Sequence, residues 1–198
     1  MKKAVHPTRE RLIQTMAELL DEERPERITA DMVLAKSGVS KGSLYHHFAD
    51  FEELLEAALV QRFSSSVDES IESISDVLHK ASSREEFFQE LGAVTADTQS
   101  PERSDRRYER ARAVGLAGSN ERFRVVLGLE QQRLTDAFTD IFREAQHRGW
   151  IQADIDPHAL AVFIQAYTLG RIVDDIAPNK VDPTAWVNLI NRIANSNF

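Results

Sequence analysis

The sequence contains no cysteine and no apolar run long enough to cross a bilayer. Disulfides and thiolate-ligated metal sites are therefore excluded, and a chain of 198 residues must be held together by a buried core. Met1, Lys2 and Lys3 lead into a charged amphipathic segment rather than an apolar one, so we expect no signal peptide and no membrane partner. These absences favour a cytoplasmic protein.

Signatures of catalysis are also missing. The sequence has no glycine-rich phosphate loop, no cysteine nucleophile and no serine in a nucleophile elbow. His46 and His47 are adjacent and point to different sides of a helix, and His147 and His158 have no partner at metal-ligand spacing. We therefore expect no enzyme, no metal and no cofactor, and an all-α enzyme is the weaker alternative.

The most informative segment that is present runs from Ile28 to Phe48 and predicts two short helices joined by a tight turn. Thr29 and Ser40 are suitable N-caps, and Gly38 can adopt the left-handed conformation that ends the first helix. Leu44 and Phe48 are spaced to share one face of the second helix. The opposite face presents Lys41, Ser43, Tyr45 and His46, which suit phosphate and base-edge contacts in a major groove. A surface helical corner that merely faces water is the alternative.

The run GVSKGSLYHHF from Gly38 to Phe48, followed by Glu52, Glu53, Leu54 and Leu55, resembles the N-terminal domain of the TetR family of transcriptional regulators. The resemblance implies a dimer that binds double-stranded DNA. It places these residues at the DNA: Thr29, Ser40, Lys41, Gly42, Ser43, Tyr45 and His46. Two departures concern Leu34, where many members have a small residue, and the Asp50-Phe51 pair, near which many have a lysine that contacts phosphate.

The charge balance is acidic, with 24 Lys and Arg against 32 Asp and Glu. Residues 1–48 carry 8 basic and 7 acidic side chains, so all of the acidic excess lies in the remainder of the chain. A DNA-binding domain usually has a basic surface. Because the segment from Ser40 to Phe48 contains no acid, we expect DNA affinity that is weak without sequence recognition and strongly dependent on salt.

Apolar residues at helical spacing predict one continuous helix from Phe51 to about Lys80, preceded by a capping box of Asp50 and Glu53. Further helices are expected over 83–99, 102–116, 120–147, 157–176 and from 183 onward, with a turn at Gly115 and Gly118. Arginines and acids alternate over 102–112, which favours a solvated, salt-bridged face over a second nucleic-acid patch. We therefore expect an all-α chain. Residues 1–50 form a three-helix helix-turn-helix domain, and 51–198 form a helical regulatory and dimerisation domain.

The segment from Pro157 to Ile176 is apolar nearly all round, so it requires cover from its own domain and from a partner. The resemblance implies dimerisation through the last two long helices and a small-molecule pocket in the helical body. The expected interface comprises Phe163, Tyr167, Trp186, Leu189, Ile190 and Ile193. The pocket candidates, each equally explained as core, are Phe88, Leu91, Thr95, Phe123, Leu127, Phe138, Phe142, Phe163 and Tyr167. Thr95, Gln131, Tyr167 and Arg171 are the polar groups that could orient a ligand.

Together these features predict a sequence-specific transcriptional regulator, a repressor by analogy with the family, that a small-molecule effector releases from DNA. The alternative is an all-α dimeric interaction module that has the corner motif without DNA-binding activity.

Overall fold

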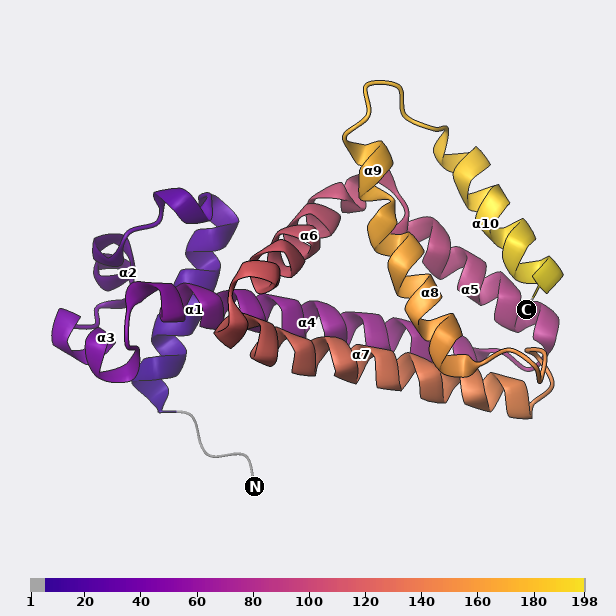
Figure 1. Ribbon diagram of the computed structural model, residues 1–198, viewed down its shortest axis with the longest axis horizontal. Coiled ribbons are helices and arrows are strands. Elements are labelled where there is room, and N and C mark those ends of the chain that lie inside the picture. Colours follow the sequence, from indigo (N-terminus) through magenta and orange to yellow (C-terminus); the bar gives the residue numbers. More distant parts are fainter. Residues whose placement is uncertain (1–5, 198) are drawn as a thin grey trace. The chain divides into compact units, whose positions relative to one another are not determined.

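The computed structural model describes residues 6–197, and every regular element in that range is helical. Figure 1 shows the α-helices in chain order. They are α1 (Pro7–Glu22), α2 (Ala30–Ser37), α3 (Lys41–His47), α4 (Phe51–Lys80), α5 (Arg84–Thr98), α6 (Ser104–Ser119), α7 (Glu121–His147), α8 (Pro157–Gly170), α9 (Ile172–Asp175) and α10 (Pro183–Asn197). Two 3₁₀ turns, η1 (Pro25–Arg27) and η2 (Pro101–Arg103), precede α2 and α6. The all-α prediction is confirmed.

The helices belong to two compact units, one ending at Ser65 and the other beginning at Ser66. Helix α4 contributes its first half to the N-terminal unit and its second half to the C-terminal unit. Its observed bounds agree with the helix predicted from Phe51 to about Lys80. The expected boundary at residue 50, between a DNA-binding domain and a regulatory domain, stays a prediction.

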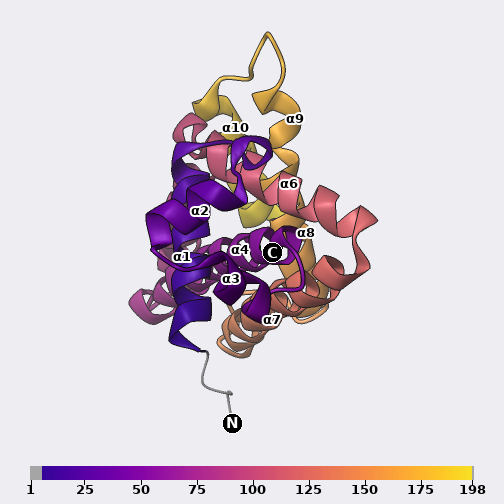
Figure 2. The ribbon, with the colours of Figure 1, turned by 90° about the vertical axis from the view of Figure 1, so that its left-hand side faces the viewer.

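The N-terminal unit is built around a small apolar core to which all four of its helices contribute. Figure 2 shows α1, α2 and α3 grouped around the start of α4. The core comprises Leu12, Met16, Leu19, Ile28, Val33, Leu44, Phe48, Leu54 and Ala58, each at most 5% exposed. Because α2 and α3 have only 8 and 7 residues, packing against this core, rather than their own length, makes them stable.

The C-terminal unit has a separate core centred on α7, where Phe123, Leu134 and Phe142 are at most 1% exposed. Helix α8 packs along α7, and α10 packs on α5. The approach of α10 to α5 is close at Gly92, where an added Cβ would lie 3.3 Å from the Asn191 side chain. Glycine at position 92 thus allows the last helix to seat against α5.

Two helix boundaries differ from the sequence-based expectation. The turn predicted at Gly115 and Gly118 is wrong, because α6 continues through both residues and ends at Ser119. Asn120 still caps α7, as expected, by accepting a hydrogen bond from the backbone N–H of Phe123 at 3.0 Å. The helix predicted over 157–176 is interrupted at Arg171, which separates α8 from the short α9.

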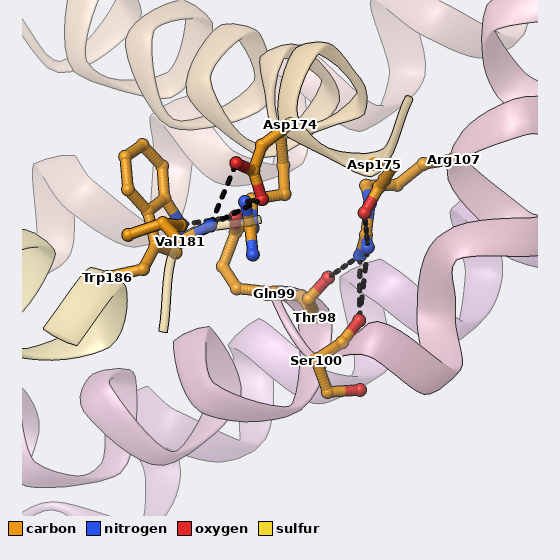
Figure 3. Close-up of polar contacts among 9 residues, drawn as sticks. Thr98, Gln99, Ser100, Arg107, Asp174, Asp175, Val181 and Trp186 are labelled. Carbon is orange, nitrogen blue, oxygen red and sulfur yellow. Dashed lines mark hydrogen bonds and ion pairs between the residues drawn. The ribbon is translucent and has the colours of Figure 1, made fainter. Parts of the chain in front are cut away.

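A buried polar cluster joins α6, α9 and the α5–η2 corner (Figure 3). The Arg107 guanidinium donates from Nε and Nη2 to the two carboxylate oxygens of Asp175, at 2.6 and 2.8 Å. It also donates to the backbone carbonyls of Thr98 and Ser100, at 2.9 and 3.1 Å. Both side chains of the ion pair are 5% exposed. Because buried charges need such partners, this contact constrains how the three segments pack.

Candidate nucleic-acid interface and ligand cavity

The turn between α2 and α3 is set by residues that the sequence identified. Gly38 has a φ of 67°, in the left-handed region that favours glycine, and its backbone N–H donates to the Leu34 carbonyl at 3.0 Å. The Thr29 hydroxyl caps α2 by accepting from the Met32 N–H at 3.4 Å, and the Ser40 hydroxyl caps α3 through Ser43 at 3.3 Å. These caps satisfy backbone donors at both helix starts and set the angle between the helices.

A capping box fixes where α4 begins relative to α3. The Glu53 backbone N–H donates to the Asp50 carboxylate at 2.6 Å, and the Glu53 carboxylate accepts from the Ala49 N–H at 2.6 Å. Buried Leu44 and Phe48 attach α3 to the core from the other side. Helix α3 is therefore held at its base and at both ends, so its outer face is presented in one orientation.

That outer face carries the predicted DNA-contacting groups. Lys41, Tyr45 and His46 are exposed, Tyr45 to 45%, while Ser43 is half-buried beside its cap. Lys41 has no ion-pair partner among residues 6–197. A row of exposed donors on a rigid short helix matches what a major groove accepts, namely base-edge and phosphate contacts. The individual DNA-contact assignments stay predictions.

The structure places two residues from the start of α1, His6 and Arg9, beside the end of α3. The His6 ring, which caps α1, lies 4.6 Å from the His47 ring, and the Arg9 guanidinium lies 4.9 Å from the Phe48 ring centroid. Burial lowers the pKa of His47, and the nearby His6, His46 and Arg9 lower it further. The start of α1 and the end of α3 therefore form one corner of histidine rings and an arginine. Helical periodicity could not place these ends together, because the contact depends on the crossing of α1 and α3.

The acidic residues at the end of α1 are largely occupied within the same unit. Lys36 lies 2.8 Å from Glu22 and 3.7 Å from Glu18, and these contacts raise the pKa of Lys36. Arg62 pairs with Asp21 and also donates to the Ala17 carbonyl at 3.1 Å. Neighbouring cations thus offset this acidic cluster, which lessens its repulsion of DNA phosphates.

The C-terminal unit contains a partly open cavity of about 210 Å³ between the second half of α4 and helices α5, α6, α7 and α8. Four predicted pocket residues line it, namely Leu91, Thr95, Phe138 and Tyr167. Burial raises the pKa of the Tyr167 hydroxyl, and contacts with the hydroxyls of Thr95 and Thr168 oppose that shift.

The other predicted pocket residues lie elsewhere. Phe88 and Phe163 line a smaller hollow of about 30 Å³ between α5, α8 and α10, to which Leu91, Thr95 and Tyr167 also contribute. Phe123, Leu127 and Phe142 are buried and line neither space. Whether any of these residues binds a ligand stays a prediction.

The larger cavity contains more charge than was expected. Its wall includes Arg103, Arg106, Arg107 and Arg110, although their segment was interpreted as a solvated face. Arg107 is only 5% exposed, so for this arginine the interpretation is wrong. The burial of Arg107 could not be predicted from its own segment, because its partner Asp175 lies 68 residues away in the sequence.

An exposed apolar surface lies on α8 and α10. Phe163 on α8 is 47% exposed, and Leu189 and Ile193 on α10 are 50% and 37% exposed. Of the other predicted interface residues, Tyr167, Trp186 and Ile190 are half-buried. Large apolar side chains gathered on adjacent helices are typical of a protein–protein interface. The dimer assignment stays a prediction.

Two classes of site find no support in the part of the chain that the structure describes. Over residues 6–197 no group of three or more His, Cys, Asp or Glu side chains is arranged to hold a metal ion. Within the same range, no helix combines the length and the apolarity needed to cross a membrane.

Comparison with known proteins agrees with the N-terminal geometry. Residues 12–58 match the family described as bacterial regulatory proteins, tetR family. The nucleoid occlusion factor SlmA of Shewanella frigidimarina is 28% identical over 171 residues, which cover 83% of this chain and 80% of the relative. SlmA of Shewanella pealeana is 27% identical over 181 residues, covering 91% and 89%.

Solved structures share the whole fold. NemR of Escherichia coli in its reduced form has a TM-score of 0.64 at 17% identity, covering 94% of this chain and 96% of NemR. A transcriptional regulator of the TetR/AcrR family from Thermobifida fusca has a TM-score of 0.61 at 15% identity, covering 98% and 99%. At this identity the likeness shows a common fold.

Proposed function

We propose that this chain, whose residues 12–58 match the tetR family of bacterial regulatory proteins, is a homodimeric repressor in the cytoplasm. In this proposal it occupies an operator in double-stranded DNA until a small-molecule effector binds its C-terminal unit. The observation that carries the proposal is the outer face of α3. Lys41, Tyr45 and His46 are exposed there, while Leu44 and Phe48 fix the helix to the core from below.

Dimerisation and DNA recognition support each other in this proposal. A single α3 is short and can read only a few base pairs, whereas a two-fold dimer presents two such helices to two half-sites. The exposed apolar side chains of α8 and α10 provide the surface for that dimer. The operator should therefore be a pseudo-palindrome.

The first experiment is selection of bound sequences from a random duplex library with the purified full-length protein. Enrichment of a pseudo-palindromic site is the expected result and supplies the operator. A folded dimer that enriches no sequence would contradict the proposal and favour a helical interaction module without DNA-binding activity.

Substitution then tests the assigned face. Lys41→Ala should lower the slope of log affinity against log salt by about 1, because one phosphate contact releases about one counterion. Lys36→Ala removes the same charge from the same unit, but Lys36 is paired with Glu22 and Glu18, so its slope should stay unchanged. Equal slopes for the two variants would remove Lys41 from the interface.

The likeness to nucleoid occlusion factors favours a second candidate, in which the chain binds DNA at chromosomal positions unrelated to promoters. Mapping of the bound positions in cells separates the two. Occupancy concentrated at promoters, with transcription rising on deletion of the gene, supports a repressor. Occupancy spread over the chromosome without transcriptional change supports the second candidate.

A further inference from the structure

We propose that DNA binding by this chain takes up a proton at the histidine corner, formed by His6, His46 and His47 beside Arg9, so that affinity for DNA rises as the pH falls. This regulation rests on the proposed function, because the DNA concerned is the duplex that α3 is proposed to bind. The site itself rests on the arrangement of rings and charges where α1 and α3 meet.

Three imidazole rings from two segments lie together at this corner. The centroid of the His47 ring lies 4.6 Å from that of the His6 ring and 5.1 Å from that of the His46 ring. His6 is the N-cap of α1, whereas His46 and His47 are the last two residues of α3. Positive charges on neighbouring rings at such distances repel one another, so a proton on one ring opposes a proton on the next.

The surroundings of His47 favour its neutral form. Burial lowers the pKa of this ring, and His6, His46 and Arg9 lower it further. Arg9 makes no ion pair with any residue in the range 6–197, so no carboxylate cancels its charge. The free protein therefore keeps His47 largely neutral at pH 7.

The acids nearest to the corner in the sequence do not change this balance. Glu10 on α1 is exposed, and the carboxylates of Asp50 and Glu53 accept the backbone N–H bonds of the α4 capping box at 2.6 Å. None of these three acids is among the groups that act on the pKa of His47. Lys41, at the other end of α3, is itself cationic. The negative charge that stabilises a proton at the corner is therefore one that a partner molecule brings.

The cap on α1 fixes which nitrogen of His6 carries its proton. His6 Nδ1 accepts a hydrogen bond from the Thr8 backbone N–H at 3.2 Å, so the neutral ring has its hydrogen on Nε2. This Nε2–H can donate to a phosphate oxygen without any change of charge, whereas a proton on Nδ1 would break the cap. His6 thus contributes a donor, and the proton taken up on binding goes to His46 or His47.

DNA supplies the negative charge that the corner lacks. A duplex carries one phosphate charge per about 1.7 Å of its axis. His46 is exposed next to Tyr45 on the face of α3 that is proposed to meet DNA, and the His47 ring adjoins it. A nearby negative charge raises the pKa of an imidazole, so the complex holds a proton that the free protein does not.

The direction of the pH dependence follows from the two states of His47. Its pKa lies below the usual 6.5 in the free protein and is higher in the proposed complex. The gain in affinity is therefore fully present below the pKa of the free protein and is lost as the pH rises through the pKa of the complex. For each proton taken up, the affinity changes by at most about tenfold per pH unit.

The test measures affinity and proton uptake on the full-length protein with the selected operator duplex. Fluorescence anisotropy at fixed ionic strength should show binding about threefold or more tighter at pH 6.0 than at pH 7.5. Calorimetry at pH 6.5 in PIPES and in Bis-Tris, whose ionisation enthalpies differ, counts the protons, and the expected number is up to about one per protomer. An affinity independent of pH, with no proton taken up, would overturn the inference.

Variants localise the proton. The double change His46→Gln with His47→Gln should bring the proton count close to zero and remove most of the pH dependence, because glutamine keeps polar groups but does not titrate. His158→Gln is the matched control, since His158 is an exposed histidine on α8 in the other unit, and it should leave both quantities unchanged. Circular dichroism checks that each variant is folded. Proton uptake that survives the double change would contradict the assignment.

Arg9→Gln gives a second, independent readout. Without the neighbouring guanidinium the free His47 ring should bind protons more readily, so fewer protons remain to be taken up from solution at pH 6.5 when DNA binds. A residue with a purely structural role would not change the proton count in this way. An unchanged count in a folded Arg9→Gln variant would remove Arg9 from the corner.

Failure of this inference can be told apart from failure of the proposed function. Binding to a selected operator that does not depend on pH would overturn the proton uptake and leave the proposed function intact. A folded protein that selects no sequence would overturn the proposed function. Calorimetry with a random duplex at low salt would then still decide whether DNA phosphates protonate the corner.

Discussion

Breaking the Arg107–Asp175 ion pair should be the most damaging single change in the C-terminal unit. Both side chains are 5% exposed, so solvent screens the pair little. The guanidinium also donates to the carbonyls of Thr98 and Ser100, which leaves those groups dependent on it. Replacing Arg107 with methionine would therefore leave a buried carboxylate and two carbonyl groups without their donor.

The expected loss is about 3–5 kcal/mol of unfolding free energy, the usual cost of leaving one partner of a buried ion pair behind. Asp175→Asn should cost a similar amount, because it leaves the Arg107 charge buried. The double variant Arg107→Met with Asp175→Leu should recover most of the loss, since it buries no charge. For a chain of this size, the single changes correspond to a fall in melting temperature of roughly 6–20 °C.

Thermal and urea denaturation followed by circular dichroism provide the measurement. Arg106→Met is the control, because the Arg106–Glu69 pair has side chains 52% and 59% exposed and should contribute at most about 1 kcal/mol. If Arg107→Met and Asp175→Asn melt within about 2 °C of this control, the reasoning is refuted, and water must reach the pair.

Three further changes test the fold and the proposed dimer. Gly38→Ala should destabilise the N-terminal unit by about 1 kcal/mol, because residue 38 has a φ of 67°. Gly128→Ala, inside α7 and facing open space, should instead stabilise the C-terminal unit slightly. Urea denaturation measures both changes. Burial, then neighbouring cationic groups, lowers the pKa of His47 below its usual 6.5. The neutral ring therefore contributes stability that is present above about pH 6.5 and is lost as the pH falls through the lowered pKa, and His47→Gln should flatten this dependence in a pH series of melting curves. Leu189→Glu should give a monomer with weakened operator binding, whereas the neighbouring Asn188→Glu should stay dimeric. Light scattering after size-exclusion chromatography measures the oligomeric state of both variants. A dimer that tolerates Leu189→Glu would place the interface elsewhere.

Local features of the fold could be predicted because their causes are local. The caps by Thr29, Ser40 and Asn120 involve partners three residues away, and Gly38 ends α2 through its own backbone conformation. The failure at Gly115 has the opposite character. A glycine there permits a turn without requiring one, and α6 continues through both glycines to Ser119.

The features that could not be predicted depend on residues distant in the sequence. Alternating charges over 102–112 describe a solvated helix until Asp175 and Gln131 are known to lie beside Arg107 and Arg110. The contact between the start of α1 and the end of α3 likewise requires the crossing of these helices, which brings the centroid of the His6 ring to 4.6 Å from that of the His47 ring. Periodicity predicts which face of a helix is buried but not which distant side chain faces it.

Arg107 connects the cavity wall to the segment that leads into the proposed dimer surface. Arg107 is tied by Asp175 to α9. Beyond α9, the Asp174 carboxylate accepts from the Val181 N–H at 3.0 Å, a bond that is the main cause of its lowered pKa and that tethers the segment leading into α10 (Figure 3). A ligand in the cavity that shifts α6 would therefore move or strain the Arg107–Asp175 pair, and through it the start of the last helix. Coupling of this kind requires only that the two arrangements of α6 differ in their affinity for the ligand.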